Sequence, residues 1–228
     1  METQRLFFLH SIPHKEYQKV IRFYGPDGAK TFISKNSKKE LRKISSTLRP
    51  CESYEVSFRE NSQKDIQFLT SFELRSPPQA FHPQLMAQRS FLAEVFYRIL
   101  RESGDPAELY QVLVEWEDQI TLRGYSPDDH VFILIQMIRK LGYGPVFDQG
   151  LYPYKYGLSP DSEPDFDQES LQKALNLHLS LSFGAVFATS FPKYNRGHAI
   201  QILLNYLLKH HPYSAEIRSA AVLYDIFR

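Results

Sequence analysis

The sequence predicts an α+β protein in two parts, a small N-terminal β-barrel followed by an all-helical domain. Up to residue 75, short segments rich in Phe, Ile, Val and Tyr are separated by turn residues, which is typical of strands. From Gln84 onward, apolar residues recur at helical spacing instead. The proline-rich run from Ser76 to Ala80 lies between the two patterns, so we expect domains at residues 1–76 and 77–228.

Five strands are expected in the N-terminal part. Gly25-Pro26-Asp27-Gly28 is a turn sequence and predicts a hairpin. Tyr54, Val56 and Phe58 alternate with polar residues, as in a strand with one buried face. Five short strands are too few for two packed sheets and fit a small barrel such as an OB fold, with an SH3-like barrel as the alternative. The predicted strands are residues 6–10, 19–24, 30–35, 54–58 and 66–74.

A basic segment, residues 35–49, separates the third and fourth predicted strands. Its apolar residues Leu41, Ile44 and Leu48 recur at helical spacing, so we expect a short amphipathic helix that closes one end of the barrel. A solvated charged helix would explain the segment without any function, whereas the functional interpretation is a phosphate-binding surface. The six cations are Lys35, Lys38, Lys39, Arg42, Lys43 and Arg49.

The net charge of +1 conceals an asymmetry between the two parts. Residues 1–75 contain 14 Lys and Arg against 9 Asp and Glu, a charge of +5, and the remaining residues contain 13 against 17, a charge of −4. A split of this kind suggests that the basic part meets a polyanion.

The helical part is expected to pack around residues 126–145. The Ser-Pro-Asp-Asp run beginning at Ser126 provides the signals of a helix start, and Gly142 and Pro145 those of its end. Residues between Val131 and Leu141 are mostly apolar, so this helix should be buried on nearly every side, although it is too short to span a bilayer. Further helices are predicted from 84 to a stop at 103–106, and at 106–122, 166–181, 197–210 and 214–228, with a small-residue connection at 184–191.

A loop rich in Tyr, Pro and Gly is expected at residues 147–164. Tyr152, Tyr154 and Tyr156 alternate within it, next to Lys155. Their rings could stack on nucleic-acid bases or pack on the surface of the domain beneath them.

Residues that could carry catalysis or bind a metal have simpler explanations. The chain contains no Walker loop, dinucleotide-binding glycine motif, nucleophile elbow or zinc-protease motif. Cys51 has no placed histidine partner, and His210 and His211 are adjacent and so point in different directions on a helix. The run Asp128-Asp129-His130 lies in a first helical turn, where acids face the helix dipole. We therefore expect no enzyme, no metal and no cofactor.

The N-terminus and the cysteine content predict the compartment. The first ten residues have too brief an apolar run for a signal peptide and no small-residue cleavage site. The single cysteine excludes an internal disulfide and fits a reducing environment. We expect a cytoplasmic protein, and a monomer.

Several strings resemble the RecO family of bacterial recombination mediators. In the helical part, Leu141-Gly142-Tyr143-Gly144 is close to the most recognisable string of the family. The other strings are Leu6-Phe7-Phe8-Leu9-His10-Ser11, Tyr24-Gly25-Pro26-Asp27-Gly28, Ser34-Lys35-Asn36-Ser37-Lys38-Lys39, Leu48-Arg49-Pro50, Phe91-Leu92-Ala93-Glu94-Val95-Phe96 and Ile217-Arg218-Ser219.

The resemblance implies an OB-fold domain and a helical domain that act without catalysis in recombinational DNA repair. Members of the family bind single- and double-stranded DNA, anneal complementary strands, contact the tail of the single-stranded-DNA-binding protein, and work with RecR to load RecA. Lys35, Lys38 and Lys39 lie on the basic loop of the family and are the implied phosphate contacts. Arg42, Lys43 and Arg49 are added from their charge alone.

Two departures from the family pattern concern zinc and a glycine. Many members hold zinc with four cysteines placed after the Leu-Gly-Tyr-Gly helix, but residues 147–164 contain none, so zinc is not expected. Asn36 replaces the glycine of the basic loop, and asparagine tolerates positive φ better than most residues.

A partner surface is also expected in the helical part. The tail of the single-stranded-DNA-binding protein is acidic and ends in an apolar residue, so its site would be an apolar groove ringed by cations. Arg98, Arg101, Arg139 and Lys140 could form that ring, although cations at helix ends have a structural explanation. The rival hypothesis is a protein-interaction scaffold of the same fold that has lost its DNA affinity, consistent with the low net charge.

Overall fold

We analyse the protein through a computed structural model. It describes residues 1–35, 37–60, 63–75, 82–99, 106–143, 168–193, 196–210 and 217–227. The chain divides into two compact units, Met1–Val114 and Glu115–Arg228. The sequence pattern changes at residues 76–83, whereas the division between the compact units falls later, inside helix α3 (Pro106–Arg123).

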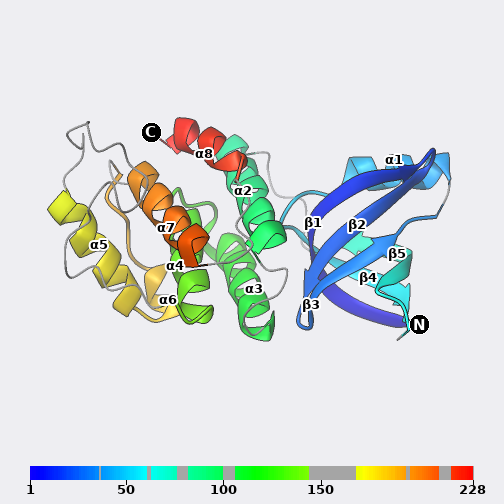
Figure 1. The fold of residues 1–228 in the computed structure, drawn as a ribbon, viewed down its shortest axis with the longest axis horizontal. Coiled ribbons are helices and arrows are strands. Elements are labelled where there is room, and N and C mark those ends of the chain that lie inside the picture. Colours follow the sequence, from blue (N-terminus) through cyan, green and yellow to red (C-terminus); the bar gives the residue numbers. More distant parts are fainter. Residues whose placement is uncertain are drawn as a thin grey trace. The chain divides into compact units, whose positions relative to one another are not determined.

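The first unit contains a closed five-stranded barrel, as the sequence predicts. Its strands are joined in the order β1-β2-β3-β5-β4, and every neighbouring pair is antiparallel except β3 with β5 (Figure 1). The first strand is longer than expected at both ends, because its start pairs with β4 from Glu2 onward and its end continues to Lys15 as one arm of a hairpin with β2. The strands are β1 (Glu2–Lys15), β2 (Gln18–Gly25), β3 (Gly28–Ile33), β4 (Ser53–Arg59) and β5 (Ile66–Leu74).

The predicted hairpin between β2 and β3 is present, and the local geometry explains why each of its two turn positions is a glycine. Gly28 has φ +100, a backbone conformation that residues with a Cβ rarely adopt. A Cβ on Gly25 would lie 2.4 Å from Leu6 Cδ2, which is too close for any contact. Gly25 and Gly28 face each other across the turn, so this short connection fixes the register of β2 against β3.

The barrel interior is filled by aromatic and aliphatic side chains from all five strands and by one helix. Helix α1 (Lys38–Thr47) contributes Ile44, which is only 1% exposed, and Leu48 just after the helix packs against the same core. The expected amphipathic helix is therefore confirmed. The buried strand residues are Leu6, Phe8, Ile21, Phe23, Phe32, Tyr54, Val56, Phe58, Leu69 and Phe72.

Helix α2 (Pro83–Ile99) and the start of α3 are held to the barrel within the first unit. The ring of Phe96 in α2 packs edge-on against Tyr24 of β2, with their centroids 5.6 Å apart. The Tyr24 hydroxyl donates to the carbonyl of Pro106 at 3.3 Å, and Tyr110 donates to the carbonyl of Arg5 at 3.0 Å. These contacts join residues that are far apart in sequence.

The second unit is built on α4 (Asp129–Lys140), which contacts α5 and α7, and α8 packs against α7. Every residue of α4 from Asp129 to Ile138 is buried, which confirms the prediction for this helix. A short helix, α6, occupies part of the stretch that we expected to be a connection. The other helices are α5 (Gln168–Ser180), α6 (Phe183–Val186), α7 (Arg196–His210) and α8 (Ser219–Phe227). No helix in the described residues has the length and apolarity needed to cross a membrane.

Helix α4 ends as its sequence predicts. Gly142 has φ +77, its N–H donates to the Arg139 carbonyl at 3.0 Å, and the N–H of Tyr143 donates to the Ile138 carbonyl at 3.1 Å. These two bonds form a Schellman motif, in which the last carbonyls of the helix are satisfied by the residues that follow it.

Replacing Gly142 by alanine should therefore destabilise the second unit. A residue with a Cβ in the left-handed region costs about 1–2 kcal/mol. Gly184, which lies in α6 and has equally open surroundings but no positive φ, is the matched control, and Gly184→Ala should be neutral or slightly stabilising. Urea unfolding followed by circular dichroism measures both changes. An equal effect of the two substitutions would contradict the assigned role of Gly142.

Candidate nucleic-acid interface

The basic helix α1 is fixed at its start by the end of β3. Ser34 is buried, its N–H donates to the Lys19 carbonyl at 3.0 Å, and its hydroxyl accepts from the Lys19 N–H at 2.9 Å. The hydroxyl of Ser37 then caps α1 by accepting from the N–H of Glu40 at 3.2 Å. Lys35 lies between these two anchored serines and is exposed.

Burial of one side of α1 decides where its cations point. Ile44 and Leu48 are held by the barrel core, whereas the four cations within the helix are all exposed. Residues four positions apart lie on the same face of a helix, so the cations form two like-charged pairs. Each such pair destabilises an isolated helix by roughly 0.2–0.5 kcal/mol. The pairs are Lys38 with Arg42 and Lys39 with Lys43.

The position of these cations along the helix is unfavourable as well. Lys38 and Lys39 are the first two residues of α1, next to the positive end of the helix dipole, where Glu40 is the acid of the same turn, and the last turn contains no basic residue. Helix electrostatics favours the reverse arrangement, with acids at the start and cations at the end. An anion bound over the first turn would relieve both this repulsion and that of the like-charged pairs.

A seventh cation, Lys19 of β2, joins this surface and is not among the phosphate contacts predicted from the sequence. Its ammonium group donates to the hydroxyl of Ser45 in α1 at 3.1 Å. On the same helix, the ammonium group of Lys43 lies 4.7 Å from the centre of the Phe72 ring, a cation–π contact with the barrel. No pattern in the sequence brings Lys19 to α1, because the contact depends on how β2 is paired with β3.

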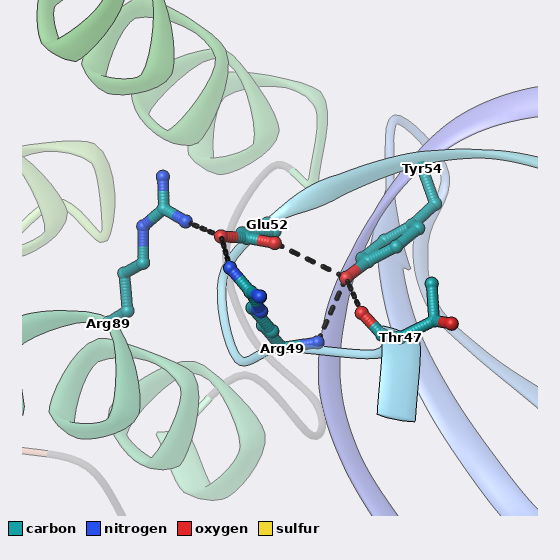
Figure 2. A network of polar contacts seen from close by, with 5 residues as sticks. All are labelled: Thr47, Arg49, Glu52, Tyr54 and Arg89. Atoms are coloured by element: carbon teal, nitrogen blue, oxygen red, sulfur yellow. Dashed lines mark hydrogen bonds and ion pairs between the residues drawn. The ribbon is translucent and has the colours of Figure 1, made fainter. Parts of the chain in front are cut away.

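A polar network anchors the end of α1, as Figure 2 shows. The Tyr54 hydroxyl donates to the carbonyl of Thr47, the last residue of α1, at 2.8 Å and accepts from the N–H of Arg49 at 2.9 Å. It also lies 3.4 Å from Oε2 of Glu52. Burial raises the pKa of Tyr54 above its ordinary value of 10, so the hydroxyl keeps the proton that it donates.

The Glu52 carboxylate connects this network to α2. Its Oε1 forms an ion pair with the Arg89 guanidinium, and both side chains are more than nine-tenths buried (Figure 2). Arg49 approaches the same oxygen at 4.0 Å and is about half exposed. Of the predicted phosphate contacts, Arg49 thus has a structural partner in Glu52, as Lys43 has in Phe72.

Cys51 and the acid-rich start of α4 are parts of the folded core. Cys51 is buried, with φ +49, and its N–H donates to the Phe8 carbonyl at 2.8 Å. Among the described residues no three His, Cys, Asp or Glu side chains are grouped as a metal site would require.

The two aspartates at the start of α4 have partners that the helix-dipole explanation did not include. Asp128 accepts from the N–H of Phe191 at 3.0 Å and pairs with Arg196. Asp129 accepts from the Trp116 ring N–H at 3.1 Å and pairs with Arg123. The expected start, with Ser126 as the N-cap, is also two residues early: the N-cap is Asp128, α4 begins at Asp129, and the Ser126 hydroxyl accepts from the Asp128 N–H at 3.3 Å.

Burial shifts two titratable groups at this helix start. It raises the pKa of Asp129, against the opposing effect of Arg123. Burial and the nearby Arg196 lower the pKa of His130 to about 3. His130 is therefore neutral in the folded protein across the physiological range.

The predicted partner cations are not assembled within one unit. Arg98 of α2 belongs to the first unit and donates from Nε to Oε1 of Glu94 at 2.9 Å. Arg139 and Lys140 belong to the second unit and are exposed, and Arg139 donates to the Leu181 carbonyl at 2.5 Å. Arg101 and the tyrosine-rich stretch 147–164 lie outside the described residues. The ring of cations stays a prediction.

Breaking the Glu52–Arg89 pair from one side should strongly destabilise the first unit. Loss of one member of a buried ion pair leaves the other charge uncompensated and costs about 3–5 kcal/mol. We expect Arg89→Met to show this loss in urea unfolding, and the double variant Arg89→Met with Glu52→Gln to regain a large part of it. Additive effects of the two substitutions would mean that the pair is not coupled.

The neutral state of His130 predicts a pH dependence of stability. Its folded pKa lies below its unfolded pKa of about 6.5, so the unfolded chain takes up more protons as the pH falls, and stability decreases. The free energy of unfolding should fall by about 2 kcal/mol from this group between pH 7 and pH 5. Asp129 has the opposite effect at lower pH. Because its folded pKa is raised, the folded protein binds more protons there than the unfolded chain, and this group adds to stability as the pH falls.

The variant His130→Gln isolates this effect, because it leaves Asp129, Arg123 and Arg196 in place. Unfolding free energies measured at pH 7 and pH 5 should differ less in the variant than in the wild-type protein. The same difference in both proteins would exclude His130 as the source.

Comparisons with known proteins do not assign a family. No protein-family model matches this chain, and no curated protein matches it either. The resemblance to the RecO family thus remains an expectation that depends on the short strings quoted above.

Proposed function

We propose that this chain is a non-catalytic DNA-binding protein of DNA repair and homologous recombination, similar to the RecO family, and that its barrel is an OB fold. The strand order β1-β2-β3-β5-β4 and the position of α1 between β3 and β4 support the OB assignment. Proteins with this fold commonly bind oligonucleotides or oligosaccharides, and the basic helix favours the former.

The observation that carries the proposal is the charge arrangement of α1. Its four exposed cations repel one another, and two of them, Lys38 and Lys39, occupy the first turn, where cations are disfavoured. The fold holds them there through Ile44 and Leu48. A phosphate backbone supplies the missing negative charge and releases counterions when it binds, so the cost of the arrangement is recovered in the complex.

Such a surface promotes annealing by neutralising charge. Two complementary strands repel each other through their phosphates, and a basic face bound to one strand lowers this repulsion for the second. Binding and proximity are sufficient for this effect, and no bond is made or broken. The protein would act in the cytoplasm with RecR and the tail of the single-stranded-DNA-binding protein, as the resemblance implies. The alternative remains a RecO-like scaffold that has kept the fold and lost DNA binding.

The proposal predicts salt-sensitive binding of DNA that depends on Lys35, Lys38 and Lys39. Fluorescence anisotropy with a labelled single-stranded oligonucleotide should show an affinity that falls steeply as salt is added. The plot of log affinity against log salt has a negative slope. Replacing all three lysines by Gln should make this slope less steep by about 2, since each phosphate contact with a single strand contributes about 0.7. Replacing them by Glu should abolish binding at moderate salt.

The matched control changes three exposed lysines of the second unit, Lys140, Lys173 and Lys193, to Glu, which alters the net charge equally. It should bind DNA nearly as the wild-type protein does. Equal losses in both charge-reversal variants would indicate a general charge effect rather than a site on α1. Absence of binding by the wild-type protein at low salt would favour the scaffold alternative.

A further inference from the structure

Two neighbouring serines in the last turn of α1 have different surroundings. The Ser46 hydroxyl donates to the carbonyl of Lys43, in the backbone of its own helix, at 3.2 Å. The Ser45 hydroxyl accepts instead from the ammonium group of Lys19, on strand β2, at 3.1 Å. Both serines are exposed. Ser45 therefore presents its oxygen to solvent and to a cation rather than to the helix backbone.

Cations also precede Ser45 in the sequence and on the helix surface. Arg42 lies three residues before it and Lys38 seven, so these three side chains share one face of α1. With Arg42 at the third position before it and Lys43 at the second, Ser45 is the one serine or threonine of the chain that has Lys or Arg at both positions. A segment of this kind fits an enzyme whose peptide-binding groove is acidic.

The end of α1 is suited to opening without the rest of the helix. Ser45, Ser46 and Thr47 are its last residues, and serine and threonine favour a helix less than the lysines, arginine and glutamate before them. Leu48 is already extended, with ψ 121. Ile44 lies in the barrel core and keeps the preceding turns in place. An enzyme that binds its substrate residue in an extended peptide thus reaches Ser45 by local opening alone.

A phosphate on Ser45 would compete with nucleic acid for the same cations. A phosphoserine carries a charge of about −1.5 to −2 at pH 7 and three acceptor oxygens. The Lys19 ammonium group already lies at hydrogen-bond distance from the oxygen that would carry the phosphate, and Arg42 is one turn away on the same face. These two cations would pair with the phosphate of the chain and be lost to the phosphates of DNA.

We propose that Ser45 is a phosphorylation site, used by a serine/threonine kinase that recognises basic segments, and that its phosphate weakens DNA binding by α1. The regulatory part of the inference rests on the proposed function. In the transfer, the Ser45 Oγ forms a bond to the γ-phosphorus of a nucleoside triphosphate, the bond from that phosphorus to the bridging oxygen breaks, and the nucleoside diphosphate leaves. The hydroxyl proton passes to the carboxylate base of the kinase.

The test of the site treats the whole chain with ATP, Mg²⁺ and a purified serine/threonine kinase that prefers basic substrates, and locates the phosphate by peptide mass spectrometry. The phosphate should be found on Ser45. Ser45→Ala should accept none, and Ser46→Ala, which removes the neighbouring hydroxyl, should accept as much as the wild-type protein. Phosphate found mainly on another residue, or on none, would overturn the site.

The effect on DNA is measured by anisotropy with a labelled single-stranded oligonucleotide before and after the treatment. Loss of two phosphate contacts should make the slope of log affinity against log salt less steep by about 1.4 and lower the affinity at moderate salt roughly tenfold or more. Ser45→Glu, which needs no kinase, should show about half of this change in slope. Ser180→Glu, at an exposed position of α5 in the second unit, should show none.

Circular dichroism establishes that each variant is folded. Equal affinities before and after phosphate has been placed on Ser45 would overturn the regulatory role and leave DNA binding by α1 intact. A wild-type protein that is phosphorylated on Ser45 but binds no DNA would overturn the proposed function and uphold the modification site.

Discussion

The arrangement of the first unit depends on the interactions of one buried carboxylate, that of Glu52. One oxygen pairs with Arg89 of α2, and the other lies beside the Tyr54 hydroxyl, which in turn holds the last carbonyl of α1. A buried charge is tolerated only when its partners are in place, so the loop between α1 and β4, the barrel and α2 must all adopt their observed positions together. The network that holds the far end of the basic helix includes one predicted phosphate contact, Arg49, whose backbone N–H donates to the Tyr54 hydroxyl.

Helix α1 illustrates how a fold can impose a charge arrangement that a free helix would avoid. Ile44 and Leu48 pack in the barrel core, and their burial determines that the lysines and arginines lie on the opposite, exposed face. Each like-charged pair is only slightly unfavourable, and the loss is small against the burial of an isoleucine, which contributes about 1.5–3 kcal/mol. The exposed face is therefore free to serve binding rather than stability.

The second unit uses buried charge in a different way. Asp128 and Asp129 each accept one hydrogen bond from a neutral N–H and pair with one arginine, and they do so at the start of the most buried helix. The carboxylates thus join α4 to α3, to α7 and to the segment before α7. In the sequence the same acids look like a helix-start signal or metal ligands, and only their partners distinguish these roles.

What the sequence alone determined are the properties that depend on neighbouring residues. Alternation gave the strands, helical spacing gave the anchored face of α1 and the burial of α4, and residue type gave the turn at Gly25–Gly28 and the end of α4 at Gly142. These features follow from the local geometry of the backbone, which repeats every two residues in a strand and every 3.6 in a helix.

The tertiary structure alone decided which distant residues meet. The parallel pairing of β3 with β5 depends on strand order, whereas the contact of Lys19 with Ser45 and the Glu52–Arg89 pair depend on how α1 and α2 pack on the barrel. Periodicity determines which face of a strand is buried, but it does not specify which strand lies beside it. The six cations of residues 35–49 were therefore identifiable from the sequence, whereas the place of Lys19 beside α1 followed only from the tertiary structure.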